Sequence, residues 1–110
     1  MNLGNIGNMG KMLKQVQKLQ AEMARVQEEL GAERVEASAG GGVVRAVANG
    51  HGELIELVID PAAVDPSDVA MLQDLVLAAV NEVQRNARSL AESKMKVVTG
   101  GLPLPGLLGS

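Results

Sequence analysis

Residues 43–61 of this 110-residue chain, VVRAVANGHGELIELVIDP, form the pattern that most limits how it folds. Two runs rich in Val and Ile, each of strand length, flank the tripeptide Gly50-His51-Gly52. Because glycine tolerates the positive φ angles of tight hairpin turns, and two glycines are present, this pattern predicts a β-hairpin. Side chains alternate between the two faces of a strand. The core face is therefore predicted to carry Val44, Ala46, Ala48, Ile55, Leu57 and Ile59.

A third strand is predicted just before the hairpin. Residues 34–39 alternate between small apolar and polar side chains and lead into Gly40-Gly41-Gly42. Neither a following helix nor a Lys-Ser or Lys-Thr pair accompanies the three glycines, so a tight turn is a better interpretation than a phosphate-binding loop. The sequence thus predicts a three-stranded antiparallel meander.

A long helix is predicted on the N-terminal side of the meander. Its apolar residues are spaced alternately three and four apart, which is a heptad pattern and predicts packing along another helix. Gly31 is a suitable end for it. Residues 1–8, with two glycines and three asparagines, are interpreted as a flexible arm. The heptad seam consists of Met9, Met12, Val16, Leu19, Met23, Val26 and Leu30.

A second long helix is predicted from Pro66 to about Val98. Asp65 is the predicted N-cap, and Gly100-Gly101 ends the helix. Such a helix is roughly 50 Å long, so its C-terminal half must project from a domain of this size. Residues 1–100 are therefore interpreted as one domain, and the Gly/Pro/Leu tail 101–110 as disordered. The fold class is α+β.

Charge is segregated along the chain even though the net charge is only −3. Residues 1–20 carry +3 and residues 81–99 carry +2, whereas the middle of the chain is strongly acidic. Basic residues on projecting helices favour contact with the phosphates of a nucleic acid. The predicted DNA-binding residues are Lys11, Lys14, Lys18, Arg85, Arg88, Lys94 and Lys96.

The chain offers little for catalysis. Its only histidine, His51, lies between two glycines in a predicted turn, where an exposed loop residue is the simpler interpretation. No enzyme activity, metal, cofactor or small-molecule substrate is expected. The absence of cysteine suits a reducing compartment, and no stretch reaches transmembrane length, so we expect a cytoplasmic protein without membrane contact.

Aromatic residues are also absent, so the core must be filled by aliphatic side chains and additional burial in a homodimer is favoured. The absence of aromatic side chains argues against a single-stranded nucleic acid as the ligand, because proteins usually bind single strands by stacking aromatic rings on the bases.

Several strings resemble the YbaB/EbfC family of bacterial nucleoid-associated proteins. They are KMLKQVQKLQAEM, SAGGGVVRAVANGHGELIELVIDP and LQDLVLAAVNEV. The resemblance covers nearly the whole chain and implies a tweezer-like homodimer whose helical arms hold double-stranded DNA. It also implies little sequence preference, association with the nucleoid and an effect on nucleoid organisation and gene expression.

The alternative hypothesis is a protein-interaction or chaperone-like adaptor without DNA binding. Its methionine-bearing seam would then bind a protein partner, because methionine side chains adapt to varied surfaces.

Overall fold

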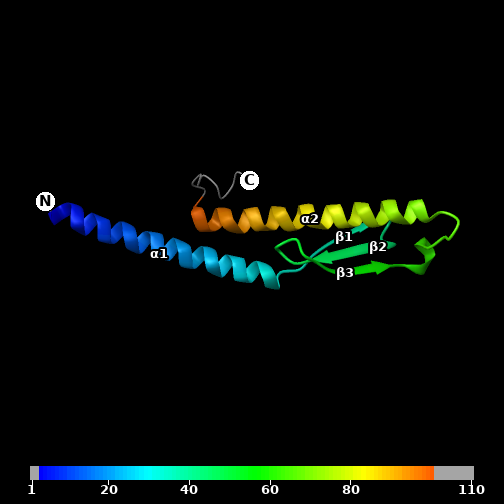
Figure 1. The fold of residues 1–110 in the computed structure, drawn as a ribbon, viewed down its shortest axis with the longest axis horizontal. Helices are drawn as coiled ribbons and strands as arrows, with labels where there is room; N and C mark the ends of the chain where they lie inside the picture. The colour runs from blue at the N-terminus through cyan, green and yellow to red at the C-terminus, as the bar shows by residue number, and fades with distance from the viewer. Residues whose placement is uncertain (1–2, 101–110) are drawn as a thin grey trace.

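The computed structural model describes the backbone of residues 3–100 and the side chains of residues 8–100. A three-stranded antiparallel sheet of order β1-β2-β3 stands between two long helices in the sequence, as predicted. The second helix lies along the sheet, whereas the first extends away from its end (Figure 1). The predicted disordered tail, residues 101–110, lies outside the described residues. The elements are α1 (Leu3–Ala32), β1 (Val35–Ala39), β2 (Val44–Ala48), β3 (Leu54–Ile59), the short 3-10 helix η1 (Pro61–Ala63) and α2 (Val69–Thr99).

Helix α1 is longer than the sequence predicts. It begins at Leu3, so residues 3–8, which the sequence predicts as part of a flexible arm, belong to the helix. Glycine weakens a helix by roughly 1 kcal/mol per residue, but it does not forbid one. The predicted end near Gly31 is confirmed, because the Glu33 N–H still donates to the carbonyls of Glu29 and Leu30 as the helix stops.

The two turns of the meander use glycine for different reasons. Gly40, Gly41 and Gly42 all have positive φ, which confirms a tight turn between β1 and β2. In the β2–β3 turn only Gly52 has positive φ. Position 50 requires glycine because the end of α1 leaves no room for a side chain: a Cβ there would lie 2.7 Å from the carbonyl oxygen of Leu30. The prediction that both glycines supply positive φ is therefore wrong for Gly50.

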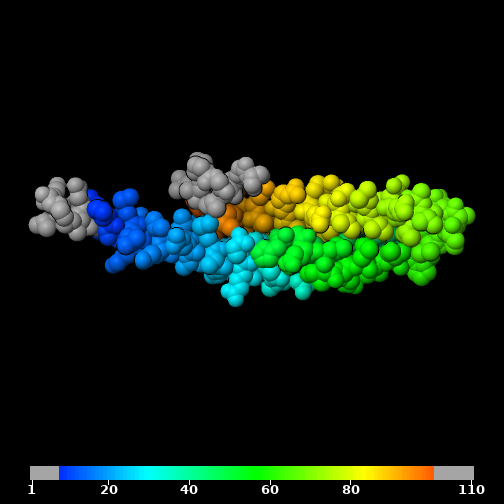
Figure 2. Space-filling model, viewed as in Figure 1, coloured from blue at the N-terminus to red at the C-terminus, as the bar shows by residue number. Residues whose placement is uncertain are grey.

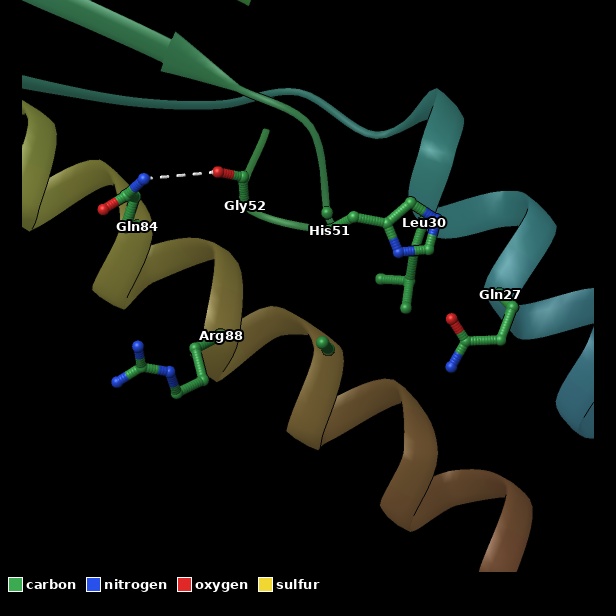
Figure 3. Close-up of a pocket in the computed structure, with 8 residues that line it drawn as sticks. Gln27, Leu30, His51, Gly52, Gln84 and Arg88 are labelled. Carbon is green, nitrogen blue, oxygen red and sulfur yellow. Dashed lines mark hydrogen bonds between the residues drawn. The ribbon is translucent and has the colours of Figure 1, made fainter. Parts of the chain in front are cut away.

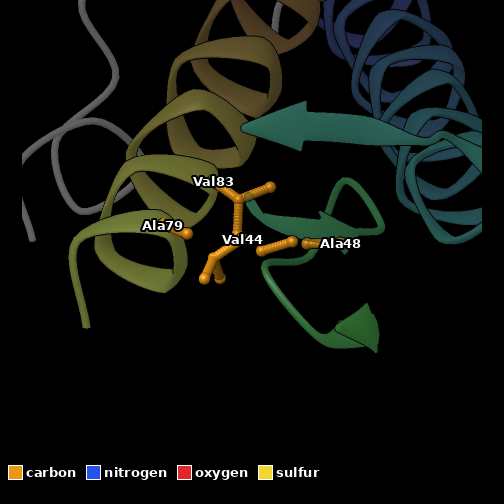
Figure 4. Packing of buried hydrophobic residues seen from close by; sticks show 5 residues of the cluster. Val44, Ala48, Ala79 and Val83 are labelled. Atoms are coloured by element: carbon orange, nitrogen blue, oxygen red, sulfur yellow. The ribbon is translucent and has the colours of Figure 1, made fainter. Parts of the chain in front are cut away.

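The main core lies between α2 and the β1–β2 part of the sheet. Helix α2 packs against β1 and β2, and five small side chains at the centre are fully buried (Figure 4). Small side chains let the helix approach the sheet closely, which compensates for the lack of aromatic filling. The five are Val44, Ala46 and Ala48 on β2 and Ala79 and Val83 on α2.

Strand β3 contributes less to this core than predicted. Ile59 packs against the cluster, but Ile55 and Leu57 remain 46% and 38% exposed. The reason is partly topological, because β3 is the sheet edge farther from β1, where α2 lies. A register shift at Val47/Ala48 also breaks the alternation, so that Ala48 pairs with Leu54.

The start of α2 also differs from the prediction. The Asp65 carboxylate accepts from the N–H and the hydroxyl of Ser67, which makes a local turn rather than a helix cap. Asp68 is the N-cap, and its carboxylate accepts from the Met71 N–H at 3.2 Å. At the other end, Gly100 adopts the left-handed conformation and caps the helix as predicted.

Helices α1 and α2 pack together beyond the sheet. A second cluster joins Val26 and Leu30 of α1 to Met95 of α2, which confirms that the C-terminal half of α2 projects from the sheet. The heptad seam, however, is only partly used: Met9, Met12 and Val16 are exposed because α1 extends past the end of α2 (Figure 2). The Cα atoms therefore span a rod of 79 × 23 × 16 Å.

Within residues 3–100, neither helix is both long enough and apolar enough to cross a bilayer.

Candidate nucleic-acid interface

The free half of α1 carries the first group of predicted DNA-binding residues. Lys11, Lys14 and Lys18 follow a spacing of three and four, so they lie along one side of the helix. All three are exposed, and among residues 8–100 no carboxylate forms an ion pair with them. This part of α1 is thus a basic rod that solvent reaches along its length.

Three basic residues of α2 are also exposed. Arg85 forms an ion pair with Glu82, one turn earlier on the same helix. Arg88 and Lys96 have no ion-pair partner among the residues whose side chains are described. An exposed pair of the Arg85 type contributes little, so contact with a phosphate readily replaces it.

Lys94 differs from the other predicted residues because it joins the two helices. Its ammonium group lies 2.8 Å from a carboxylate oxygen of Glu33 and 3.8 Å from one of Glu29. The hydrogen bond to Glu33 raises the pKa of Lys94 above its ordinary value. The carboxylates of Glu29 and Glu33, at the end of α1 and just after it, already balance the charge of Lys94. Lys94 therefore serves mainly to hold the helices together.

Arg25 extends this network along α1. Its guanidinium lies 2.6 Å from Glu22 and 2.5 Å from Glu29. The hydrogen bond from Arg25 lowers the pKa of Glu22, and the Arg25 charge adds to the effect. Two of the three acids in the second half of α1, Glu22 and Glu29, are therefore paired with Arg25, while residues 3–18 of the helix carry lysines and no acid.

A polar cleft lies where α1 ends, the β2–β3 turn passes and α2 continues toward its C-terminus. We call it the junction cleft. Its volume is about 450 Å³, with Leu30 and Ala91 among its apolar lining residues. In Figure 3 the His51 ring and the Gln27 amide lie on the α1 side, and Gln84 and Arg88 come from α2, with the Gln84 amide directed toward Gly52 and the Arg88 side chain directed away from His51 and Gln27. Among residues 8–100, no acidic side chain lines the cleft.

Asn49 fixes the conformation of the turn that lines this cleft. Its buried side-chain oxygen accepts from the N–H groups of His51 and Glu53, and its amide donates to the Glu53 carboxylate. The Gly50 N–H donates to the Leu30 carbonyl at 2.8 Å, and the Gln84 amide donates to the Gly52 carbonyl at 3.5 Å. The turn is thus tied to both helices, which holds His51 in place.

The predicted residues therefore occupy separate places along the rod rather than one pocket. Lys11, Lys14 and Lys18 lie on the free part of α1, and Arg85 and Arg88 lie on α2 near the β2–β3 turn. Of the seven, only Arg88 lines the junction cleft.

No pattern in the sequence indicates that Gln27, His51 and Gln84 are neighbours in a cleft. They come from three segments far apart in the chain, so no local spacing indicates the cleft. His51 is exposed, as predicted.

Across residues 8–100, no three His, Asp or Glu side chains are arranged to hold a metal ion. The groups offered to a ligand are hydrogen-bond donors and cations. Such groups bind phosphate oxygens and other anions.

Comparison with known proteins supports the same class of ligand. The family model of the YbaB/EbfC DNA-binding family matches residues 5–102. A nucleoid-associated protein of Moorella thermoacetica is 59% identical over 86 residues, which cover 78% of this chain and 83% of the relative. One of Thermoanaerobacter sp. (strain X514) is 54% identical over 89 residues, which cover 81% and 80%.

The fold also has a counterpart among solved structures. The crystal structure of an uncharacterized protein from Helicobacter pylori superposes with a TM-score of 0.65 at 21% identity, covering 94% of this chain and 99% of that one. At this identity the likeness concerns the fold alone. The match of the family model over nearly the whole chain, together with close relatives, shows that this chain belongs to the YbaB/EbfC DNA-binding family.

Proposed function

We propose that this protein binds double-stranded DNA as a homodimer, with little sequence preference, and that it acts at the nucleoid on DNA organisation and gene expression. The observation that carries this proposal is the free half of α1, which has no acid and carries three exposed lysines without an ion-pair partner among residues 8–100. Family membership and the names of the relatives support the same ligand.

Phosphate contacts supply the affinity in this proposal. The principal contacts are the exposed residues without acidic partners, joined by Arg85 once it leaves Glu82. Lys94 contributes chiefly by keeping α1 against α2. Contacts of this kind position a protein on the duplex without reading its bases. The proposed contacts are Lys11, Lys14, Lys18, Arg85, Arg88 and Lys96, with Lys94 in support.

The homodimer is supported by apolar surface that a single chain leaves uncovered. Strand β3 exposes a row of aliphatic side chains, and an apolar groove on α2 is lined by Leu72, Val76, Leu77 and Val80 among others. Both lie at the same end of the rod, opposite the free half of α1 (Figure 1). Burial of this end in a dimer leaves the basic arms free to reach a duplex. The exposed residues of β3 are Leu54, Ile55, Leu57 and Val58.

The first test measures fluorescence anisotropy of a labelled random-sequence duplex at several salt concentrations, with a single-stranded control. Neutralising each phosphate changes the slope of log K against log salt by about 0.9, so six to ten contacts give a loss of ~10³- to 10⁵-fold between 50 and 200 mM salt. Replacing Lys11, Lys14 and Lys18 by Gln lowers the slope by about 2.7 per bound subunit. Absence of duplex binding at low salt overturns the proposal.

The second test measures molar mass by light scattering. Leu77→Glu places a charge in the apolar groove and is expected to convert a dimer into a monomer. Val97→Glu is the matched control, because Val97 is also exposed and lies on the same helix, at the other end. A wild-type chain that stays monomeric at high concentration refutes the dimer.

A second candidate function is the protein-interaction adaptor, and the exposed seam residues Met9, Met12 and Val16 favour it. Charge reversal at Arg85 and Arg88 separates the two functions. It abolishes DNA binding if the basic arms hold the duplex, and it leaves capture of a protein partner intact if the seam is the functional surface.

A further inference from the structure

The junction cleft offers a binding site beyond the exposed lysines of the arm. We propose that it binds a phosphate group with its attached sugar, through Arg88, His51 and the amides of Gln27 and Gln84. The inference rests on the proposed function when the phosphate belongs to a DNA backbone. A free nucleotide carries the same chemistry, and the experiment below distinguishes the two sources.

The residues that line the cleft carry positive charge and hydrogen-bond donors. The chain has thirteen acidic and ten basic residues, yet the described residues that line the cleft include one arginine, one histidine and two glutamines and no acid. The nearby Glu53 carboxylate accepts from the Asn49 amide at 2.9 Å. Arg88 has no ion-pair partner within residues 8–100, unlike Arg85 one turn earlier. Its guanidinium is therefore available for an anion.

The backbone of the β2–β3 turn forms one wall of the cleft and is preorganised. Asn49 fixes the turn from within, Leu30 binds it on the α1 side and Gln84 binds it on the α2 side. The His51 ring lies against Gly31, where a Cβ would be 3.6 Å from its Nε2 atom. A neutral imidazole still donates one N–H, so His51 is a donor in either protonation state. A wall held in this way loses little entropy when a ligand binds.

The size and the position of the cleft both suit a phosphate with its attached sugar. A cavity of about 450 Å³ is larger than a bare phosphate and is within the range of small-molecule sites. The apolar lining residues Leu30 and Ala91 suit the sugar, while the polar walls suit the phosphate oxygens. The cleft lies on the α1–α2 junction, between the sheet and the free half of α1 (Figure 1). A duplex held along the arm would have a backbone phosphate near this point.

The experiment follows the amide signals of Gly50, His51 and Gly52 by ¹H–¹⁵N NMR on the full chain. The probes are a short random-sequence duplex, deoxyadenosine monophosphate, inorganic phosphate and, as a control without phosphate, deoxyadenosine. The expected result is that the turn amides shift with phosphate-bearing probes and not with deoxyadenosine. Shifts with the duplex alone assign the site to DNA backbone, and saturable shifts with the mononucleotide assign it to a free nucleotide.

Variants are tested in parallel by duplex anisotropy. Arg88→Gln is expected to weaken duplex binding about tenfold and to lower the salt slope by about 0.9 per bound subunit. His51→Ala and Gln27→Ala each weaken it about threefold through a lost hydrogen bond. Arg34→Gln is the matched control, because Arg34 is exposed and bonds only to the Glu33 carbonyl.

The outcomes separate this inference from the proposed function. Duplex binding with unmoved turn amides, and with Arg88→Gln equal to Arg34→Gln, overturns the cleft while leaving DNA binding intact. Mononucleotide binding without duplex binding supports the cleft and refutes the proposed function. Equal shifts with deoxyadenosine also overturn the cleft as a phosphate site.

Discussion

Gly50→Ala is expected to destabilise the protein more than any other single methyl addition in the β2–β3 turn. The new Cβ would lie 2.7 Å from both the Leu30 carbonyl oxygen and its Cδ2 atom, and 3.0 Å from its Cα. Two of these three atoms are backbone, so a side-chain rotation cannot relieve the contact. The turn must move away from α1, which also stretches the 2.8 Å hydrogen bond from Gly50 to Leu30.

The magnitude follows from these two losses. Overpacking costs about 1–3 kcal/mol and the hydrogen bond about 0.5–1.5 kcal/mol, so the free energy of unfolding falls by about 2–4 kcal/mol. Urea unfolding followed by far-UV circular dichroism measures it, at one fixed protein concentration because dimerisation contributes to stability. Gly10→Ala is the control, since nothing lies within 4 Å of its Cβ position. It is expected not to lower stability.

A Leu30→Ala background sharpens the test. It removes the Cδ2 contact but leaves both backbone atoms in place, so Gly50→Ala still costs more than about 1 kcal/mol there. A loss below about 0.5 kcal/mol in the wild-type background would show that the close approach of turn and helix is not a constraint.

Three further predictions concern the core, the start of α2 and the ion pairs of α1. Val83→Ala removes a fully buried side-chain volume and lowers the free energy of unfolding by about 2 kcal/mol, measured by urea unfolding. Asp68→Ala removes the N-cap of α2 and lowers the melting temperature more than Asp65→Ala does, because the cap contributes about 1 kcal/mol; equal effects would contradict the assignment. Glu22 has a lowered pKa in the folded state, so its contribution is present above its ordinary pKa of 4.5 and is lost as the pH falls below it. Glu22→Gln is therefore expected to lose less stability than the wild-type chain as the pH falls through that acid range, measured by thermal unfolding at a series of pH values. An equal loss in the two chains would show that the ion pair between Arg25 and Glu22 does not form in solution.

Local patterns predicted the elements well because each carries its own signal. The alternation in residues 35–39 and 43–59 indicates strands, and the heptad of α1 indicates a helix, without reference to the rest of the chain. The left-handed glycine at position 100 likewise has a local cause. The class of fold and the order of the strands could therefore be predicted from the residues alone.

What could not be predicted depends on contacts between distant segments. Whether Leu57 is buried depends on which strands α2 covers, and the strand pattern is the same in either case. Asp65 and Asp68 both fit a helix cap, and only the competing bonds to Ser67 decide between them. The junction cleft is the extreme case, since its walls come from residues 27–30, 50–52 and 84–91.

The distribution of charge links these packing details to DNA. Three of the four acids in residues 22–33, which span the second half of α1 and the residue after it, are paired: two of them with Arg25 and two with Lys94, Glu29 being shared. These pairs neutralise acid at the α1–α2 junction and hold the helices together. Lys11, Lys14 and Lys18 are left without such partners on the part of α1 that extends past α2. An acidic chain with a net charge of −3 thereby presents three lysines, unpaired among residues 8–100, on a part of α1 where no described element competes with a phosphate.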